Sequence, residues 1–143
     1  MNIFRSCSKL NLMSLIVLAL TLSESQKIFA SEFSFEFDWS DLKKCTTGNP
    51  NTVKNPIFIL QNVPNGTKFI YFKLTDKNVP SYNHGGGWVE YKGENEIAPG
   101  SFTYKSPCPP NGKHNYEWTA SAKAKKGLFA GTIAKAKASK YYP

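Results

Sequence analysis

The sequence predicts an all-β domain, and three observations support that expectation. Apolar and polar residues alternate from Phe33 to Trp39, which is typical of a half-buried strand. Further short runs are rich in β-branched and aromatic residues, and turns rich in glycine, proline and asparagine separate them. Only one short segment near the C-terminus has the composition of a helix. Six or so strands with at most one short C-terminal helix therefore define the expected fold class.

Residues 1–30 have the layout of a secretory signal peptide. Arg5 and Lys9 precede an apolar run over residues 10–22, and the small residue Ala30 follows it. The run is shorter than the roughly 20 apolar residues that a spanning helix needs, so we favour export over retention as a membrane anchor. We expect cleavage after Ala30, with cleavage after Ser25 as the alternative. The mature chain is then a single domain over residues 31–143, in the periplasm or outside the cell.

The first strand is expected to place Phe33, Phe35, Phe37 and Trp39 on one face. After a turn-rich connection, two more strands are expected over residues 56–60 and 68–74, connected through residues 63–66. The second of these is apolar on both faces for most of its length, so it should be a central strand. Residues 76–87 are expected to form a loop.

Short strands should follow at residues 88–91, around residues 101–104, and at residues 114–122. The segment from 132 to 140 is ambiguous. Alanine and lysine are good helix formers and Thr132 can cap a helix, so we favour a helix, but the alternation of alanine with lysine also fits an edge strand.

The mature chain keeps two cysteines, Cys45 and Cys108, because Cys7 leaves with the signal peptide. An even pair in an oxidising compartment favours one disulfide. Two free thiols are the main alternative. A metal or redox pair is less favoured, because the sequence has neither a CxxC motif nor a histidine cluster.

The full chain carries a net charge of +8. The predicted signal peptide holds Arg5, Lys9, Lys27 and Glu24, a net +2, so the mature chain carries +6. Six lysines and no acidic residue lie between Thr119 and the C-terminus. Such a segment is usually a solvated face. The alternative is a weak, salt-sensitive contact with an anionic membrane through Lys135, Lys137 and Lys140, and we expect no nucleic-acid partner.

Two turn-rich stretches, residues 76–87 and 107–116, hold most of the candidate polar chemistry. They contain both histidines, His84 and His114, together with Asp76 and Tyr116. Residues 114 and 116 lie on one face of a strand, so both can point into one cavity. The glycines from Gly85 to Gly87 can bring backbone amides close to an anion, although a flexible turn explains them too. Each residue also has an ordinary structural explanation, such as a solvated histidine or an Asx turn at Asp76.

These stretches resemble motifs of the phosphatidylethanolamine-binding protein (PEBP) family, in its small secreted bacterial, Raf-kinase-inhibitor-like branch. The resemblance covers about residues 55–122. It rests on Asn55-Pro56 with Val63-Pro64-Asn65-Gly66-Thr67-Lys68, on Asp76-Lys77-Asn78-Val79-Pro80, and on Pro107-Cys108-Pro109-Pro110-Asn111-Gly112-Lys113-His114-Asn115-Tyr116. Lys77, Asn78 and Asn115 depart from the family pattern.

The resemblance implies an antiparallel β-sandwich with a large central sheet and a shallow anion pocket. Its ligand-binding residues would be Asp76, His114 and Tyr116, with His84 as the candidate for a second histidine and Gly85 and Gly86 beside it. The expected function is an exported, noncatalytic binding protein for phosphate-bearing or other small anions such as a phospholipid head group, without cofactor or metal. An inhibitor of a protease or kinase is the alternative. A hydrolase using His114 or His84 as base is less favoured, because the sequence lacks the GxSxG and HExxH motifs.

Overall fold

The structure is a computed structural model that describes residues 31–39, 42–127 and 129–143. The predicted signal peptide over residues 1–30 lies outside the described residues. Within the described part of the chain the fold is all-β and contains no helix, so the expected fold class is confirmed. None of the described segments is a helix long and apolar enough to cross a membrane.

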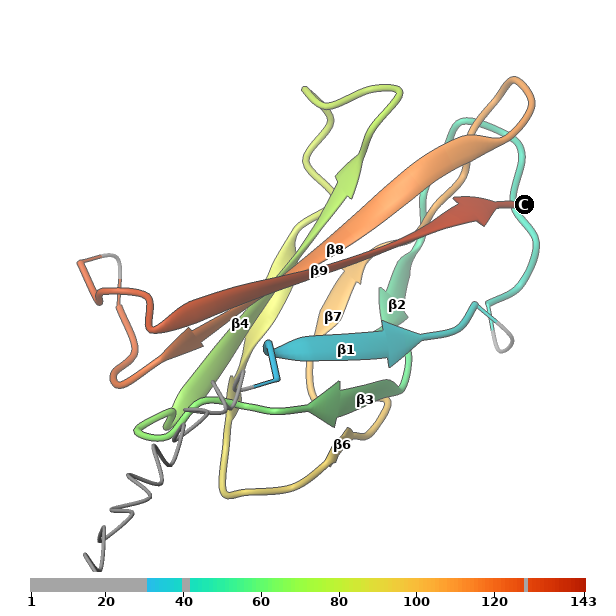
Figure 1. Ribbon diagram of the computed structural model, residues 1–143. Coiled ribbons are helices and arrows are strands. Elements are labelled where there is room, and N and C mark those ends of the chain that lie inside the picture. Colours follow the sequence, from blue (N-terminus) through green and yellow to red (C-terminus); the bar gives the residue numbers. More distant parts are fainter. Residues whose placement is uncertain (1–30, 40–41, 128) are drawn as a thin grey trace, which may run out of the picture.

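The described residues form nine strands, which alternate with loops along the whole domain (Figure 1). In chain order they are β1 (Ser34–Phe37), β2 (Thr52–Lys54), β3 (Phe58–Gln61), β4 (Phe69–Asp76), β5 (Gly86–Glu90), β6 (Glu96–Ile97), β7 (Thr103–Lys105), β8 (His114–Lys123) and β9 (Ala134–Tyr142).

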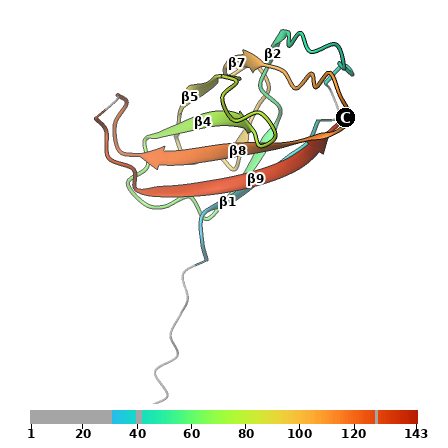
Figure 2. The same cartoon turned by 90° about the horizontal axis from the view of Figure 1, so that it is seen from above.

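The strands form three antiparallel sheets. The largest has the order β5-β4-β8-β9, a second has the order β1-β3-β6, and β2 pairs with β7. Figure 2 shows the long strands β4, β8 and β9 side by side, with β1 next to β9. The expected central position of β4 is confirmed, since it pairs with β5 on one side and with β8 on the other.

The core lies between the four-stranded sheet and the β1-β3-β6 sheet. Alternate residues of β4 and β8 point inward, and Phe72 and Trp118 are fully buried. From the other sheet, Phe58 stacks on Phe72 with ring centroids 4.3 Å apart. The alternation predicted for the first strand is confirmed, because Phe35 and Phe37 are both 5% exposed. Aromatic side chains of this size account for much of the apolar area that the domain buries.

The helix favoured for residues 132–140 is wrong, because this segment forms the edge strand β9. Ala120 of β8 pairs with Ala136, which is buried, while the neighbouring Lys135 and Lys137 are exposed. The alternation of small and charged residues therefore matches the two faces of a sheet. Pairing along the whole of β8 outweighs the modest helix propensity of alanine and lysine.

The loop expected over residues 76–87 is shorter than predicted, because β5 already begins at Gly86. Gly86 and Gly87 pair with Lys73 and Phe72 of β4. A Cβ atom on Gly86 would overlap the carbonyl oxygen of Phe72, so only glycine allows the two backbones to approach this closely. The short strands β2 and β6 were not predicted, because neither has a periodic pattern long enough to recognise.

Candidate functional site

The predicted site residues converge because β4 and β8 are paired. Asp76 is the last residue of β4, and it lies opposite Tyr116 in the β4–β8 register. His114 is the first residue of β8, two positions before Tyr116. Antiparallel pairing thus brings the end of one strand beside the start of the other. Asp76, His114 and Tyr116 come together at one end of the four-stranded sheet.

The Asp76 carboxylate is buried and organises the site. Its Oδ2 atom accepts a hydrogen bond from Nδ1 of His114 at 2.7 Å. Its Oδ1 atom accepts hydrogen bonds from the backbone amides of Asn78 at 2.8 Å and Val79 at 3.2 Å. Burial alone would raise the pKa of Asp76, but these hydrogen bonds outweigh burial and hold the pKa below its usual value. Asp76 is therefore ionised at neutral pH.

The hydrogen bond to Asp76 fixes the proton arrangement of His114. An ionised carboxylate only accepts, so the hydrogen lies on Nδ1 of His114. The other ring nitrogen, Nε2, is on the other side of the ring. The His114 side chain is 14% exposed, against 5% for Asp76. His114 can thus offer Nε2 to a ligand as an acceptor when neutral and as a donor when protonated.

His84 is more deeply buried and has a different environment. Its Nδ1 atom lies 2.8 Å from the carbonyl oxygen of Lys105, which can only accept, so Nδ1 carries the hydrogen. Burial lowers the pKa of His84, and the Lys105 hydrogen bond and the Asp76 charge oppose that effect only in part. His84 is therefore neutral at pH 7, and its Nε2 atom is an acceptor. Its ring contacts Tyr82 and Tyr116, with centroids 4.6 Å and 5.4 Å away.

Tyr116 contributes a phenol that stays protonated. It is 1% exposed, and burial together with the negative charge of Asp76 raises its pKa far above the usual value. The hydroxyl is therefore a neutral donor beside an ionised carboxylate.

These groups line a pocket of about 210 Å³. The lining residues are Gly48, Pro50, Asp76, Val79, Tyr82, His84, Cys108, Pro109, Pro110, His114 and Tyr116. All four predicted polar residues are therefore brought together. Asp76 is the only carboxylate among the lining residues, and no lysine or arginine is among them. The remaining wall is largely proline and aromatic surface.

The two predicted glycines, Gly85 and Gly86, are not among the lining residues. The Gly85 amide donates to Asn83 Oδ1, and its carbonyl oxygen accepts from the Leu74 amide. Both groups therefore serve the turn and the adjoining strand. In contrast, sequence reasoning missed Gly48 and Pro50, although the predicted disulfide already implied that the segment after Cys45 approaches the Cys108 loop.

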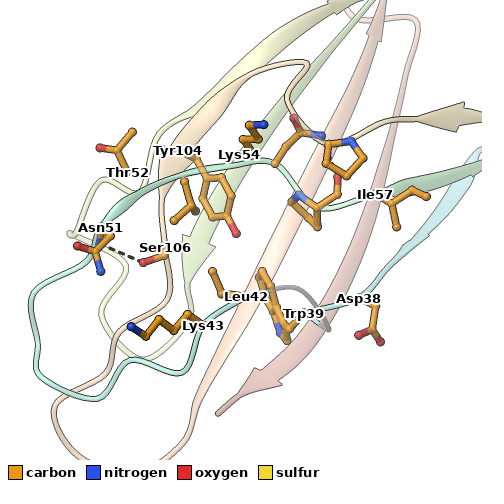
Figure 3. Close-up of a pocket in the computed structure, with 14 residues that line it drawn as sticks. Asp38, Trp39, Leu42, Lys43, Asn51, Thr52, Lys54, Ile57, Tyr104 and Ser106 are labelled. Atoms are coloured by element: carbon orange, nitrogen blue, oxygen red, sulfur yellow. Dashed lines mark hydrogen bonds between the residues drawn. The ribbon is translucent and has the colours of Figure 1, made fainter.

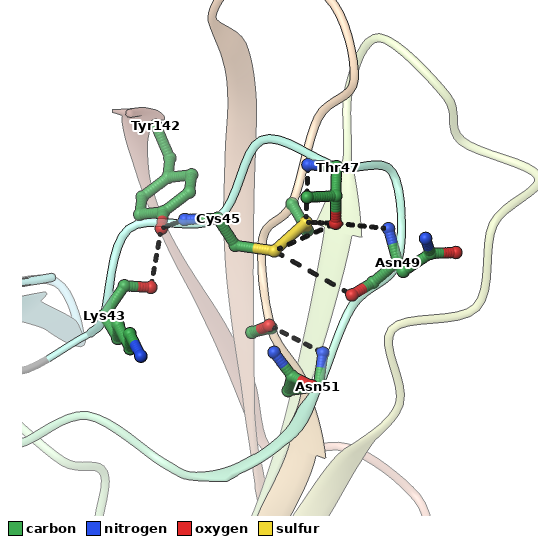
Figure 4. Close-up of a disulfide and its surroundings, with 8 residues drawn as sticks. Lys43, Cys45, Thr47, Asn49, Asn51 and Tyr142 are labelled. Carbon is green, nitrogen blue, oxygen red and sulfur yellow. Dashed lines mark hydrogen bonds between the residues drawn. A yellow bond between two sulfur atoms is a disulfide. The ribbon is translucent and has the colours of Figure 1, made fainter.

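The predicted disulfide between Cys45 and Cys108 is confirmed, and it joins residues 63 positions apart (Figure 4). Cys108 also lines the pocket. On the other side of the bridge, the Cys45 amide donates to the Tyr142 hydroxyl at 2.8 Å, and that hydroxyl donates to the Lys43 carbonyl oxygen at 3.1 Å. The bridge thus connects the segment after β1 to the pocket wall and to the end of β9. A disulfide of this kind is compatible with an extracytoplasmic location.

The three lysines considered for membrane contact do not share one environment. Lys140 pairs with Asp38 at 2.8 Å, and Lys137 pairs with Glu117 at 2.9 Å. Lys135 is exposed and lies opposite Ser121 of β8. None of the three lines the pocket.

Comparisons with known proteins agree with the fold. No family model matches the chain, and no curated protein matches it. Among solved structures, the chain is similar to one described as a phosphatidylethanolamine-binding protein homologue from Chlamydia trachomatis, with a TM-score of 0.54 and 16% sequence identity. The match covers 78% of this chain and 97% of the other. At this identity the likeness shows a shared PEBP-like fold alone.

Proposed function

We propose that the pocket around Asp76 and His114 binds a small anionic ligand of the phosphate or phospholipid head-group type, in an exported, noncatalytic binding protein. The observation that carries the proposal is the 2.7 Å hydrogen bond between Asp76 Oδ2 and His114 Nδ1 inside a lined pocket. This bond holds the His114 ring so that Nε2 is left for a ligand. Membership of the secreted, Raf-kinase-inhibitor-like branch is part of the same proposal.

The polar groups of the pocket suit a partly protonated oxyanion. Protonated His114 can donate to an anionic oxygen, while neutral His84 can accept from a protonated oxygen or an ammonium group. The single hydrogen of the Tyr116 hydroxyl is bonded to Asp76. The charge on protonated His114 offsets that of Asp76, so an anion gains only modest electrostatic attraction. We therefore expect weak affinity.

Titration with inorganic phosphate and with phosphorylethanolamine, followed by amide NMR, tests the proposal. Resonances of residues 76–85 and 106–116 should shift, and His114→Gln should weaken binding at least about tenfold because it loses the imidazole ring that Asp76 orients. Lys92→Met, which alters an exposed lysine outside the pocket, is the matched control and should bind like the wild type. Absence of any shift at millimolar ligand in the folded wild type would refute the proposal.

A hydrolase is the second candidate function, because a carboxylate bonded to Nδ1 of a histidine is the arrangement that orients a catalytic base. The lining residues include no serine or threonine, and the Cys108 sulfur is held in a disulfide. Binding without turnover is therefore the better supported function. Hydrolysis in a panel of esters and phosphoesters, abolished by His114→Gln, would favour the enzyme instead.

Inhibition of a protease or kinase remains the alternative within the binding class, and it is supported only by the family resemblance. A pull-down from the exported fraction separates the two functions, since a small-anion pocket needs no stable protein partner.

Export itself is supported by the layout of residues 1–30 and by the Cys45–Cys108 disulfide. Mass spectrometry of the mature protein should find Ser31 as the first residue, or Gln26 if cleavage follows Ser25. Retention of Met1 would contradict export with cleavage.

The lysine-rich C-terminal strand supports at most a weak membrane contact. Lys137 and Lys140 are already paired with acidic side chains, which leaves less of their charge for lipid. Sedimentation with anionic vesicles should therefore show weak association that disappears at high salt, or none.

A further inference from the structure

A second cavity, larger than the pocket around Asp76, lies apart from it. It has a volume of about 500 Å³, within the usual range for small-molecule sites. The segment after β1, the strand β2 and the strand β7 enclose it (Figure 3). It shares no lining residue with the Asp76 pocket.

The inner wall of this cavity is apolar and firmly held. Tyr104 is 4% exposed and packs against the buried Trp118, with ring centroids 4.9 Å apart. Trp39 packs edge to face on Phe37 and on Tyr142, at 4.8 Å and 6.0 Å. Leu42, Ile57 and Pro56 add further apolar surface. Rings fixed in this way form a preformed surface, so a ligand binding there loses little affinity to rearrangement.

The wall also carries a polar group. In Figure 3 the phenol of Tyr104 enters the cavity. The indole Nε1 atom of Trp39 is itself buried, so Trp39 offers the cavity the carbon surface of its ring rather than its N–H group.

The charges around the cavity favour an anion. Lys43 and Lys54 both line it, are exposed, and come from different segments. Within the described part of the chain neither forms an ion pair. The one acidic lining residue, Asp38, is paired with Lys140 at 2.8 Å. Two lysines therefore remain available for a negative group at the mouth of an apolar cavity.

We propose that this cavity is a second ligand site and that it takes an amphipathic monoanion, with one carboxylate on an apolar chain of about eight to ten carbons. The apolar chain contacts Trp39, Leu42 and Tyr104, and the carboxylate reaches Lys43 or Lys54. A small inorganic anion is a poor fit, because it would leave the aromatic wall uncovered. A neutral chain of the same length would leave the two lysines without a partner. The site is independent of the function proposed for the Asp76 pocket.

The probe is decanoate, used below its micelle concentration, with decanol and acetate as comparisons. Binding is followed through the indole N–H resonance of Trp39 in an NMR spectrum, which is identified by its absence in Trp39→Phe. Decanoate should shift this resonance, decanol should bind more weakly, and acetate should have no effect. The double variant Lys43→Met/Lys54→Met should weaken decanoate binding about tenfold, because the carboxylate then has neither lysine to pair with.

The matched control is Lys44→Met/Lys105→Met, which removes two exposed lysines next to the cavity segments but outside the lining. It should bind decanoate like the wild type. Thr52→Trp, an exposed lining residue of β2, should block the cavity and abolish binding. His114→Gln should leave decanoate binding unchanged, which separates this site from the Asp76 pocket.

An unchanged Trp39 resonance at millimolar decanoate in the folded wild type would overturn the proposal. Equal binding of decanoate by Thr52→Trp, or an equal loss in both double lysine variants, would also overturn it, because adsorption elsewhere on the surface would then explain the signal.

Discussion

Trp39 and Tyr116 pack edge to face, with ring centroids 6.3 Å apart, and each lines a different cavity. Tyr142 contacts both rings, at 6.0 Å from Trp39 and 6.4 Å from Tyr116. The two cavities therefore share an aromatic cluster that belongs to the core. A ligand that displaced Trp39 would press on Tyr116, whose hydroxyl lies beside the Asp76 carboxylate.

We predict that Tyr142→Phe destabilises the fold. The Tyr142 hydroxyl accepts from the Cys45 amide and donates to the Lys43 carbonyl oxygen, so its loss leaves two backbone groups without their partner. The free energy of unfolding should fall by about 1–2 kcal/mol in urea denaturation. Tyr141→Phe is the control, because Tyr141 is 66% exposed, and it should have almost no effect. Equal stability of the two variants would contradict the role given to Tyr142.

Removing the disulfide should destabilise the domain and loosen the Asp76 pocket. The bridge joins residues 63 positions apart, and closing a loop of that size lowers the entropy of the unfolded chain. The variant Cys45→Ser/Cys108→Ser should lose about 4 kcal/mol of stability, measured by urea denaturation. Phosphate binding should weaken as well, because Cys108 lines that pocket.

Reduction of the wild type provides the control for this prediction. A reductant should lower the denaturation midpoint of the wild type towards that of the double serine variant, and it should leave the variant unchanged. A wild type indifferent to reductant under unfolding conditions would argue against the bridge.

The stability of the fold should depend on pH through His84. Burial lowers the pKa of His84, so the unfolded chain takes up a proton near 6.5 while the folded chain still resists it. The free energy of unfolding therefore has its full value, as far as His84 is concerned, above pH 6.5. It decreases as the pH falls from 6.5 through the lower pKa that His84 has in the folded state. The loss is at most about 1.4 kcal/mol per pH unit for one proton.

Urea denaturation of the wild type and of His84→Gln over this pH range isolates the effect, since both proteins share every other titrating group. The stability difference between them should shrink as the pH falls. A difference that stays constant with pH would show that His84 is not held neutral by burial.

The edge strand β9 can be tested by placing a charge on each of its faces. Ala136 is 5% exposed and opposite Ala120, so Ala136→Asp would bury an unpaired carboxylate. We expect a loss of about 3 kcal/mol or more, or failure to fold. Lys135→Asp introduces the same group on the exposed face of the same strand, opposite Ser121, and should change stability by less than about 0.5 kcal/mol. Similar losses from both variants, measured by thermal unfolding, would contradict the register of β9.

Some elements were predictable because their signal lies in consecutive residues. The alternation from Phe33 to Phe37 specifies which face of β1 is buried without knowledge of its partner. The run of residues that forms β4 is apolar on both faces, and this pattern of consecutive residues indicated a central strand. The Asp76, His114 and Tyr116 grouping was predicted from motifs and from the i, i+2 relation of residues 114 and 116.

Other features have no local signal. Ala136 has a good helix former on either side, and only pairing with β8 makes this segment a strand. The glycines at 86 and 87 were interpreted as part of an anion-binding loop, whereas Gly86 is required by the backbone of β4. The cavity beside Trp39 is assembled from segments around residues 38–43, 51–57 and 99–106, so no motif describes it.

The sequence by itself determined the all-β class, and it favoured both the pairing of Cys45 with Cys108 and the polar residues of the first pocket. Side-chain periodicity and residue chemistry are properties of short stretches, so they can be interpreted before folding is considered. The tertiary structure alone decided that residues 134–142 form a strand rather than a helix. It also decided the 2.7 Å hydrogen bond between Asp76 and His114 and the existence of a second cavity. These three features depend on which distant strands pair and in what register. The packing of remote segments against one another determines which arrangement has the lowest free energy, and no single segment contains that information.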